Sequence, residues 1–228
     1  MANTQNPNIP EVTGTLRAFR LAVPQEIYAC SGIRIFGRLI RSVLFSTDAC
    51  IIANSNADAV IAVYPFTPQP VITEAVMKVA GVPVFVGVGG GLTQGLRVIN
   101  LALHAEFQGA CGVVVNAPTS NEVIRELKGT VDVPVVVTVL SETEDIDARF
   151  HAGADILNIS AAAKTPQVVA AVRQRYPDAP IIATGGPTPE SIRATVAAGA
   201  NCITWTPPSN GEVFKGIMDA YRKGLPHP

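Results

Sequence analysis

The chain has 228 residues, of which 48% are hydrophobic and only 15% are charged. That apolar fraction is too high for a disordered chain, and this length suits one large α/β domain. The formal net charge of −1 gives no general electrostatic field for nucleic acid or for an anionic membrane. We therefore expect neither as a partner.

The N-terminus and the cysteines carry no targeting or metal-binding pattern. Residues 1–10 lack the basic and apolar regions of a signal peptide, and no run of about 18 apolar residues occurs. The cysteines are Cys30, Cys50, Cys111 and Cys202, with no CxxC pair and no histidine at ligand spacing. We expect the four cysteines to be small buried side chains that stay reduced in the cytoplasm. The sequence therefore predicts a cytoplasmic protein that has no disulfide, no metal site and no cofactor.

The first part of the chain differs from the rest. Residues 1–15 are polar and contain proline, which predicts a loosely ordered N-terminus. Residues 16–41 hold a candidate helix over 16–23 and then two apolar and basic runs on either side of Gly37, which suits a hairpin turn. We expect residues 16–41 to cover the bottom of the domain that follows.

From residue 42 onward, short apolar runs rich in β-branched residues alternate with helix-length segments. Eight runs occur, at 42–46, 59–64, 84–88, 112–116, 135–139, 155–160, 181–185 and 201–206. Continuous apolar runs are typical of strands that are buried on both faces. Helix starts are indicated by Thr-Pro pairs at 67–68, 165–166 and 188–189, and by capping-box spacings from Thr119, Ser141 and Ser209.

The runs form a longer repeat. Proline opens the third, fifth and seventh runs, whereas Gly-Ala precedes the fourth, sixth and eighth, so the repeating unit is βαβα. Four units predict a single (β/α)8 TIM barrel over residues 42–223, with residues 16–41 as an N-terminal cover and 224–228 as a tail. An open doubly wound sheet is the alternative, but the fourfold repeat favours closure.

In such a barrel the site lies at the carboxyl ends of the strands. Two glycines follow the seventh run, and the segment after the eighth run leads into the last helix. Backbone N–H groups in a glycine turn beside a helix N-terminus bind anions. The predicted phosphate ligands are therefore Gly185, Gly186, Ser209, Asn210 and Gly211. The alternative is a tight turn beside an ordinary helix cap.

A second glycine-rich segment follows the third run. Gly89, Gly90 and Gly91 are consecutive, which is costly in chain entropy, and their spacing does not complete a dinucleotide fingerprint. We interpret them as a mobile loop over the site or as a second anion cradle. A tight turn between strand and helix is the alternative.

Candidates for acid–base chemistry are few. None of the three histidines lies at a predicted strand end, and no G-x-S-x-G motif occurs. Asp48, Glu142 and Lys164 are the predicted catalytic residues, although each also fits an ordinary charge at a helix start. The predicted ligands of the substrate body are Asn116, Thr138, Asn158, Ser160, Thr184 and Thr206.

Residues 181–192, IIATGGPTPESI, and the AGAN sequence at 198–201 resemble the C-terminal quarter of the phosphate-binding, ribulose-phosphate-binding-like (β/α)8 barrels. That superfamily includes ribulose-phosphate epimerase, thiazole synthase and the aldolase for 2-keto-3-deoxy-6-phosphogluconate. The resemblance implies a phosphate-binding barrel but matches no single member. The aldolase carries its imine-forming lysine in the sixth strand, where this chain has Leu157-Asn158-Ile159, and the strand-end histidines of the epimerases are missing here.

These observations predict a chain that binds and transforms a small phosphorylated metabolite at the C-terminal face of the barrel, by lyase or isomerase chemistry. Two alternatives stay open: a non-catalytic sensor of such a metabolite, and a hydrolase on the same scaffold. A homo-oligomer also stays open, because barrels with bare apolar helix faces often associate.

Overall fold

The computed structural model of the chain describes residues 10, 12, 14 and 21–227. Almost all of the predicted loose N-terminus, and residues 16–20 of the predicted helix, lie outside these residues. The strands are β1 (Ile33–Ile35), β2 (Arg38–Ile40), β3 (Ser42–Phe45), β4 (Ala59–Ala62), β5 (Val84–Gly89), β6 (Gly112–Val115), β7 (Val135–Val139), β8 (Ile156–Ile159), β9 (Ile181–Thr184) and β10 (Cys202–Trp205).

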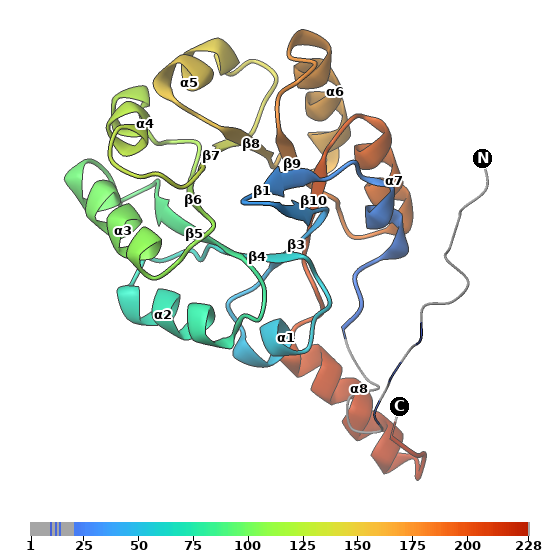
Figure 1. The fold of residues 1–228 in the computed structure, drawn as a ribbon. Helices are drawn as coiled ribbons and strands as arrows, with labels where there is room; N and C mark the ends of the chain where they lie inside the picture. Colours follow the sequence, from blue (N-terminus) through green and yellow to red (C-terminus); the bar gives the residue numbers. More distant parts are fainter. Residues whose placement is uncertain (1–9, 11, 13, 15–20, 228) are drawn as a thin grey trace.

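The α-helices are α1 (Ala49–Ala53), α2 (Pro70–Val79), α3 (Leu96–Phe107), α4 (Asn121–Lys128), α5 (Ile146–Ala152), α6 (Thr165–Arg175), α7 (Pro189–Ala197) and α8 (Asn210–Arg222). Two 3-10 turns are η2 (Gln25–Ala29) and η3 (Ala162–Lys164). Strands β3 to β10 close into a parallel barrel in chain order, with β10 paired to β3 (Figure 1). The predicted single TIM barrel is confirmed. None of the described helices is both long and apolar enough to cross a bilayer.

The strands are buried on both faces. Alternate side chains, including Val43, Phe85 and Ile182, fill the barrel interior, and their neighbours pack outward against the helices. This two-sided burial is the reason that the sequence shows continuous apolar runs rather than a polar alternation.

The β1–β2 hairpin closes the bottom of the barrel. Its Ile35 and Ile40 side chains belong to the interior cluster, and the thiol of Cys202 in β10 donates to the Ile40 carbonyl at 2.9 Å. Gly37 adopts a positive φ of 82° in the turn, as a hairpin at this position requires. The predicted hairpin is confirmed, but the bottom cover consists of residues 33–40 alone, because residues 21–31 pack in the outer ring of helices.

The segment 21–31 takes a place in the outer ring of helices. It packs between α7 and the end of α1, where the Leu21 N–H donates to the Asn54 carbonyl at 2.8 Å (Figure 1). Its Val23 and Ile27 side chains are buried in the outer cluster, beside residues of β3 and β10. This is the position that the eighth helix of a barrel would cover. Helix α8, in contrast, buries no side chain and extends away from the ring (Figure 1).

Of the six predicted helix starts, two are correct, two are wrong, and the two at Thr119 and Thr165 are displaced by one residue, because Ser120 caps α4 and Lys164 is the N-cap of α6. Thr188 and Ser209 each cap a helix through a complete capping box. The predicted start at Thr67 is wrong because the Tyr64 hydroxyl accepts the Gln69 N–H, so α2 begins after Gln69. The predicted start at Ser141 is wrong too. The Glu144 carboxylate accepts the Leu140 N–H, and the helix that follows, α5, is capped by Asp145.

Three of the four cysteines match the predicted burial. Cys30, Cys111 and Cys202 are buried, whereas Cys50 is exposed on α1 because its side chain faces away from the strands. Burial raises the pKa of Cys30 to about 11 and that of Cys111 to about 12, and it also raises the pKa of Cys202. The expectation for Cys50 was therefore wrong.

Thiol labelling of the folded chain is expected to modify Cys50 alone. At pH 8 the three buried thiols are protonated and inaccessible, and only a thiolate reacts quickly with iodoacetamide. Mass spectrometry should find one adduct on the native chain and four after denaturation. Rapid labelling of Cys30 in the native chain would contradict the burial of segment 21–31.

Candidate functional site at the carboxyl ends of the strands

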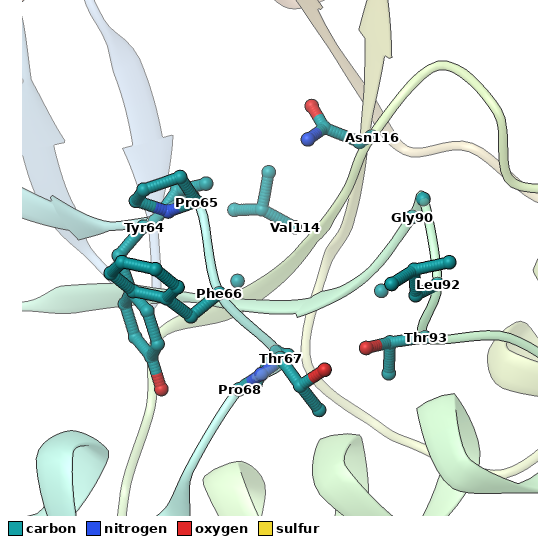
Figure 2. A pocket seen from close by; sticks show the side chains of 14 residues that line it. Tyr64, Pro65, Phe66, Thr67, Pro68, Gly90, Leu92, Thr93, Val114 and Asn116 are labelled. Atoms are coloured by element: carbon teal, nitrogen blue, oxygen red, sulfur yellow. The ribbon is translucent and has the colours of Figure 1, made fainter.

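A cleft with two adjoining lobes opens at the carboxyl ends of the strands. The first lobe, of about 460 Å³, lies between the segment after β4 and the segment after β5 (Figure 2). The second lobe, of about 630 Å³, lies between the segment after β3 and residues 206–209. The lobes share Val63, Tyr64, Pro65 and Asn116, so they form one continuous cleft.

Tyr64 holds the wall between the lobes in place. Its ring lines both lobes, and its hydroxyl accepts the Gln69 N–H at 2.5 Å just before α2 (Figure 2). The hydroxyl points away from Gly90 and Asn116 in this view. Tyr64 therefore contributes an apolar face to the cleft, while its polar atom supports the loop.

The glycines at the end of β5 are explained by close packing against other residues of the chain. A Cβ atom at Gly87 would lie 2.9 Å from Val63, one at Gly89 would lie 2.7 Å from Val98, and one at Gly90 would lie 2.3 Å from the Asn116 Cβ atom. Gly87 and Gly89 belong to β5 itself. The close approach that these glycines permit is thus between parts of this chain.

The loop that carries Gly91 is tied at its base. The Gly90 N–H donates to the Thr93 carbonyl at 3.0 Å, and the Thr93 N–H donates back to the Gly90 carbonyl at 3.2 Å. Thr93 is buried, whereas Leu92 at the tip is 98% exposed. The structure therefore favours the tight-turn alternative for these residues, and motion of the loop over the site stays a prediction.

An arc of polar side chains lines the opposite side of the barrel mouth. The side-chain amide of Asn158 donates to the Thr138 hydroxyl at 3.2 Å, and the Thr184 hydroxyl donates to the Ser160 hydroxyl at 3.2 Å. These four predicted substrate ligands come from β7, from β8 and the residue that follows it, and from β9, so the fold brings them together in two neighbouring pairs. Asn116 and Thr206, the other two, lie across the mouth and line the cleft.

Thr204 completes this arc from β10. Its side chain faces the barrel interior, because Cys202 two positions earlier belongs to the interior cluster. The residue is 7% exposed, and within the described part of the chain its hydroxyl has no hydrogen-bond partner. A buried hydroxyl without a partner is unfavourable by about 1–3 kcal/mol. A ligand oxygen in the mouth would relieve that penalty.

The three predicted catalytic residues are not gathered in one place. The Asp48 carboxylate lines the second lobe, but it also caps α1 by accepting the Cys50 N–H at 2.8 Å and the Ile51 N–H at 3.2 Å. Glu142, after β7, is exposed, and so is Lys164 at the start of α6. Of the three, only Asp48 borders the cleft.

The predicted phosphate ligands lie at two separate helix starts. The Gly185 N–H already donates to the Thr204 carbonyl at 3.2 Å, and a Cβ atom there would lie 2.6 Å from Ile203. Gly186 adopts a positive φ of 79° ahead of α7. Ser209, by contrast, lines the second lobe at the start of α8, followed by Asn210 and Gly211 on its first turn.

Each helix start carries a carboxylate in its first turn, Glu190 in α7 and Glu212 in α8. Hydrogen bonds from backbone N–H groups hold the pKa of Glu190 below its usual value at α7, and that of Glu212 at α8. The Glu212 carboxylate accepts the Ser209 N–H at 2.8 Å. A phosphate at either position must compete with a neighbouring negative charge.

Sequence reasoning missed most of the apolar cleft wall. Phe45 at the end of β3, Phe66 and Pro68 in the segment after β4, and Pro207 after β10 line it. The available signal was the cluster of proline and aromatic residues in YPFTPQP at 64–70, which was interpreted only as a helix start.

The described residues contain no group of three or more His, Cys, Asp or Glu side chains that could hold a metal ion. This bears on a divalent cation at the barrel mouth, because Mg²⁺ is held through carboxylates and substrate oxygens. The carboxyl ends of β5 and β6 instead carry glycines and Asn116. These residues do not fit a metal centre of that kind.

Several solved structures share the fold of this chain. Phosphonopyruvate hydrolase matches with a TM-score of 0.62 and 15% identity, over 87% of this chain and 86% of that chain. The fold is shared. 2,3-Dimethylmalate lyase, a member of the PEP mutase/isocitrate lyase superfamily, matches with a TM-score of 0.60 and 13% identity, over 80% and 77% of the two chains. Mandelate oxidase matches with a TM-score of 0.59 and 17% identity, over 78% and 68%.

These identities support a statement about the fold alone. No protein-family model matches the chain, and no curated protein does. The resemblance to ribulose-phosphate-binding-like barrels predicted the architecture correctly, but these neighbours come from other groups of TIM barrels, the PEP mutase/isocitrate lyase superfamily among them.

Proposed function

We propose that this chain binds a small carboxylate or phosphorylated metabolite in the cleft at the barrel mouth, and transforms it by lyase- or isomerase-type chemistry. The observation that carries the proposal is the buried, unpartnered hydroxyl of Thr204, at the end of an arc of hydroxyl and amide groups. Such groups donate hydrogen bonds to anionic oxygens.

The roles divide between the two sides of the mouth. Thr138, Asn158, Ser160, Thr184 and Thr204 bind the anionic end of the metabolite, and the apolar wall of the first lobe takes the carbon skeleton. Asn116 and Thr206 contact it from the second lobe. In this proposal the Asp48 carboxylate transfers a proton to or from the metabolite, because Asp48 borders the cleft. Lys164 and Glu142, which are exposed outside the cleft, are the other candidates for proton transfer.

A carboxylate fits this arrangement with less rearrangement than a phosphate. A phosphate held by Gly186 and the start of α7 would lie near the negative charge of Glu190, whereas a carboxylate can use the side chains of the arc. The names of the three neighbours refer to phosphonopyruvate, 2,3-dimethylmalate and mandelate, and all three compounds are small carboxylates. These names support the compound class without assigning a substrate.

The direct experiment is a thermal-shift panel with phosphonopyruvate, 2,3-dimethylmalate, mandelate, oxalate and inorganic phosphate. Oxalate is included because one structure of phosphonopyruvate hydrolase holds oxalate and Mg²⁺. A ligand at 100 times its Kd stabilises the folded state by about 2.7 kcal/mol, which raises the melting temperature by several degrees. Compounds that bind are then followed by NMR for turnover. A panel in which no anion raises the melting temperature would overturn the proposal.

The Thr204→Val variant separates the binding role of this hydroxyl from its effect on stability. Valine has nearly the same shape, so the free energy of unfolding should stay unchanged or rise by up to about 1 kcal/mol as the unpartnered hydroxyl is removed. The affinity for every carboxylate that binds should fall about tenfold, because a hydrogen bond to a charged group is lost. Isothermal calorimetry and chemical denaturation measure the two quantities.

Thr195→Val is the matched control. Thr195 is also buried, but its hydroxyl donates to the Ser191 carbonyl at 3.0 Å within α7, and Thr195 does not line the cleft. This change should lower the free energy of unfolding by about 1 kcal/mol and leave ligand affinity unchanged. Equal affinities for Thr204→Val and the unmodified chain would remove Thr204 from the site.

One observation favours a sensor without chemistry as the second candidate. The only predicted catalytic residue that borders the cleft, Asp48, already uses its carboxylate to cap α1. A sensor would bind a panel compound and leave it unchanged over hours at high protein concentration. An Asp48→Asn variant that abolishes turnover while keeping affinity would instead support the enzyme.

A further inference from the structure

The lining of the cleft carries negative charge only. Among the described residues that line its two lobes, Asp48 and Glu212 are the only charged side chains, and lysine, arginine and histidine are absent. Lys164 is exposed outside the cleft. Arginine and lysine are the side chains that pair with phosphate and carboxylate groups. The cleft therefore lacks the positive charge that an anion with two or more charges requires.

Both carboxylates of the second lobe are fixed in place by the helices that they cap. The Asp48 carboxylate accepts the Cys50 N–H at 2.8 Å at the start of α1. The Glu212 carboxylate accepts the Ser209 N–H at 2.8 Å and the Ser209 hydroxyl at 2.7 Å at the start of α8. Those hydrogen bonds hold the pKa of Glu212 below its usual value, so this side chain is negative at neutral pH. The second lobe thus has a carboxylate on each of its two walls.

The first lobe is uncharged, and apolar side chains form most of its wall. Val63, Pro65, Phe66, Leu92 and Val114 line it (Figure 2). Phe66 is 73% exposed, and Leu92 is almost fully exposed. An apolar group in this lobe removes part of both surfaces from water, which is favourable. Exposed apolar side chains around one cavity are typical of a binding groove, so the lobe suits an apolar group and offers no ion pair to an anionic one.

We propose that the cleft selects a monocarboxylate with an apolar substituent and rejects compounds that carry a second negative charge. The inference rests on the proposed function, in which the arc of hydroxyl and amide groups binds one carboxylate. Those neutral donors suffice for a single carboxylate. A second anionic group lies either in the uncharged first lobe or beside Asp48 and Glu212 in the second. Repulsion of this kind excludes a ligand that otherwise fits.

Glu212 is a specificity-determining residue for this cleft. Its charge raises the free energy of every bound anion, and the effect grows with the number of charges on the ligand. Monoanions therefore lose little affinity, whereas dianions lose more. Phosphorylated metabolites belong to the rejected class, because a phosphate group on its own carries a charge of about −1.5 to −2 at pH 7.

Three compounds with the pyruvate skeleton test the selectivity. Phenylpyruvate adds a phenyl group to pyruvate, whereas phosphonopyruvate adds a phosphonate group at the same carbon. Isothermal calorimetry should give phenylpyruvate an affinity about tenfold above that of pyruvate, because the phenyl group buries more apolar surface. Phosphonopyruvate should bind more weakly than pyruvate, by about fivefold or more.

The outcomes separate this inference from the proposed function. Phosphonopyruvate that binds as tightly as phenylpyruvate overturns the selectivity and leaves the proposed function intact. If none of the three compounds binds, and no other anion of the thermal-shift panel does, the proposed function fails and the selectivity fails with it.

Glu212→Gln removes the charge and keeps a side chain that can complete the capping box. The affinity for phosphonopyruvate should rise about fivefold, and that for phenylpyruvate by no more than about twofold. Glu190→Gln is the matched control, because Glu190 lies in the first turn of α7 and does not line the cleft. A rise in phosphonopyruvate affinity for Glu190→Gln, with none for Glu212→Gln, places the anion at α7 and overturns the inference.

Phe66→Ala tests the apolar lobe. The affinity for phenylpyruvate should fall about threefold or more, and the affinity for pyruvate should stay unchanged. Phe107→Ala is the matched control, because Phe107 on α3 is 79% exposed and does not line the cleft. Circular dichroism should show both variants folded, since both side chains are exposed. An unchanged phenylpyruvate affinity for Phe66→Ala puts the substituent outside the first lobe and rules out its role in selection.

Discussion

Replacing Arg173 with methionine is expected to lower the free energy of unfolding by about 3 kcal/mol. The Arg173 guanidinium, on α6, donates to the carbonyls of Gly199 at 2.9 Å, Pro177 at 2.6 Å and Ala179 at 2.8 Å. It also donates to the side-chain oxygen of Asn201 at 2.7 Å. Methionine keeps the apolar stem but leaves these acceptors unpaired near the start of β9 and β10.

Arg175→Met on the same helix is the matched control. Arg175 is exposed, and it pairs with Asp147 and lies over the Tyr176 ring. Exposed ion pairs contribute at most about 1 kcal/mol, so this variant should lose far less stability than Arg173→Met. Urea denaturation of both variants measures the difference. Equal losses would show that the carbonyls around Arg173 do not depend on it.

The second large effect is expected at Gly90. A Cβ atom there would lie 2.3 Å from the Asn116 Cβ atom. Gly90 also has a φ of 118°, a backbone angle that residues other than glycine rarely adopt. Gly90→Ala must therefore push β5 and the end of β6 apart. We expect a loss of about 2–4 kcal/mol in the free energy of unfolding, and a loss of ligand affinity as Asn116 moves.

Gly91→Ala separates the steric effect from the effect of the loop. Gly91 also has a positive φ, of 59°, but a Cβ atom there meets no atom within 4 Å. The left-handed conformation alone costs about 1–2 kcal/mol, so stability should fall modestly and Asn116 should stay in place. Denaturation and calorimetry on both variants make the comparison. Similar affinities for the two variants would contradict a positioning role for Gly90.

The strands of the barrel were predictable because their environment is uniform. A strand such as β7, with five buried residues in VVVTV, must be apolar on both faces, so sequence and structure coincide. Helix starts were less predictable where a distant side chain claims a backbone N–H. The Tyr64 hydroxyl accepts the Gln69 N–H in this way, and no sequence motif near Thr67 predicts this hydrogen bond.

The outer ring could not be predicted from the repeat. A helix follows every barrel strand in sequence, which led to the expectation of four equivalent βαβα units. Whether α8 or segment 21–31 covers β10 depends on their competition for one surface. The buried Val23 and Ile27 decide it, and their pattern is too short to identify from sequence alone.

The position of the candidate site residues in the fold was predictable at the level of strand ends and no further. Asn116, Thr138, Asn158, Ser160 and Thr184 all reach the barrel mouth, as their positions after or within strand ends required. Sequence could not show that Gly87, Gly89 and Gly90 serve contacts with Val63, Val98 and Asn116, because each of those partners belongs to another element. Glycine count alone cannot distinguish a ligand contact from such packing.

The seam between β3 and β10 joins the two ends of the chain, since the bond between Cys202 and Ile40 links residues 162 positions apart. A ribosome must finish almost the whole chain before this seam can form. Until then, the free edge of β3 and the underside of the β1–β2 hairpin have no cover, and contacts of such long range form slowly. The growing chain therefore keeps an unpaired strand edge for most of its synthesis, which is the kind of edge that promotes aggregation.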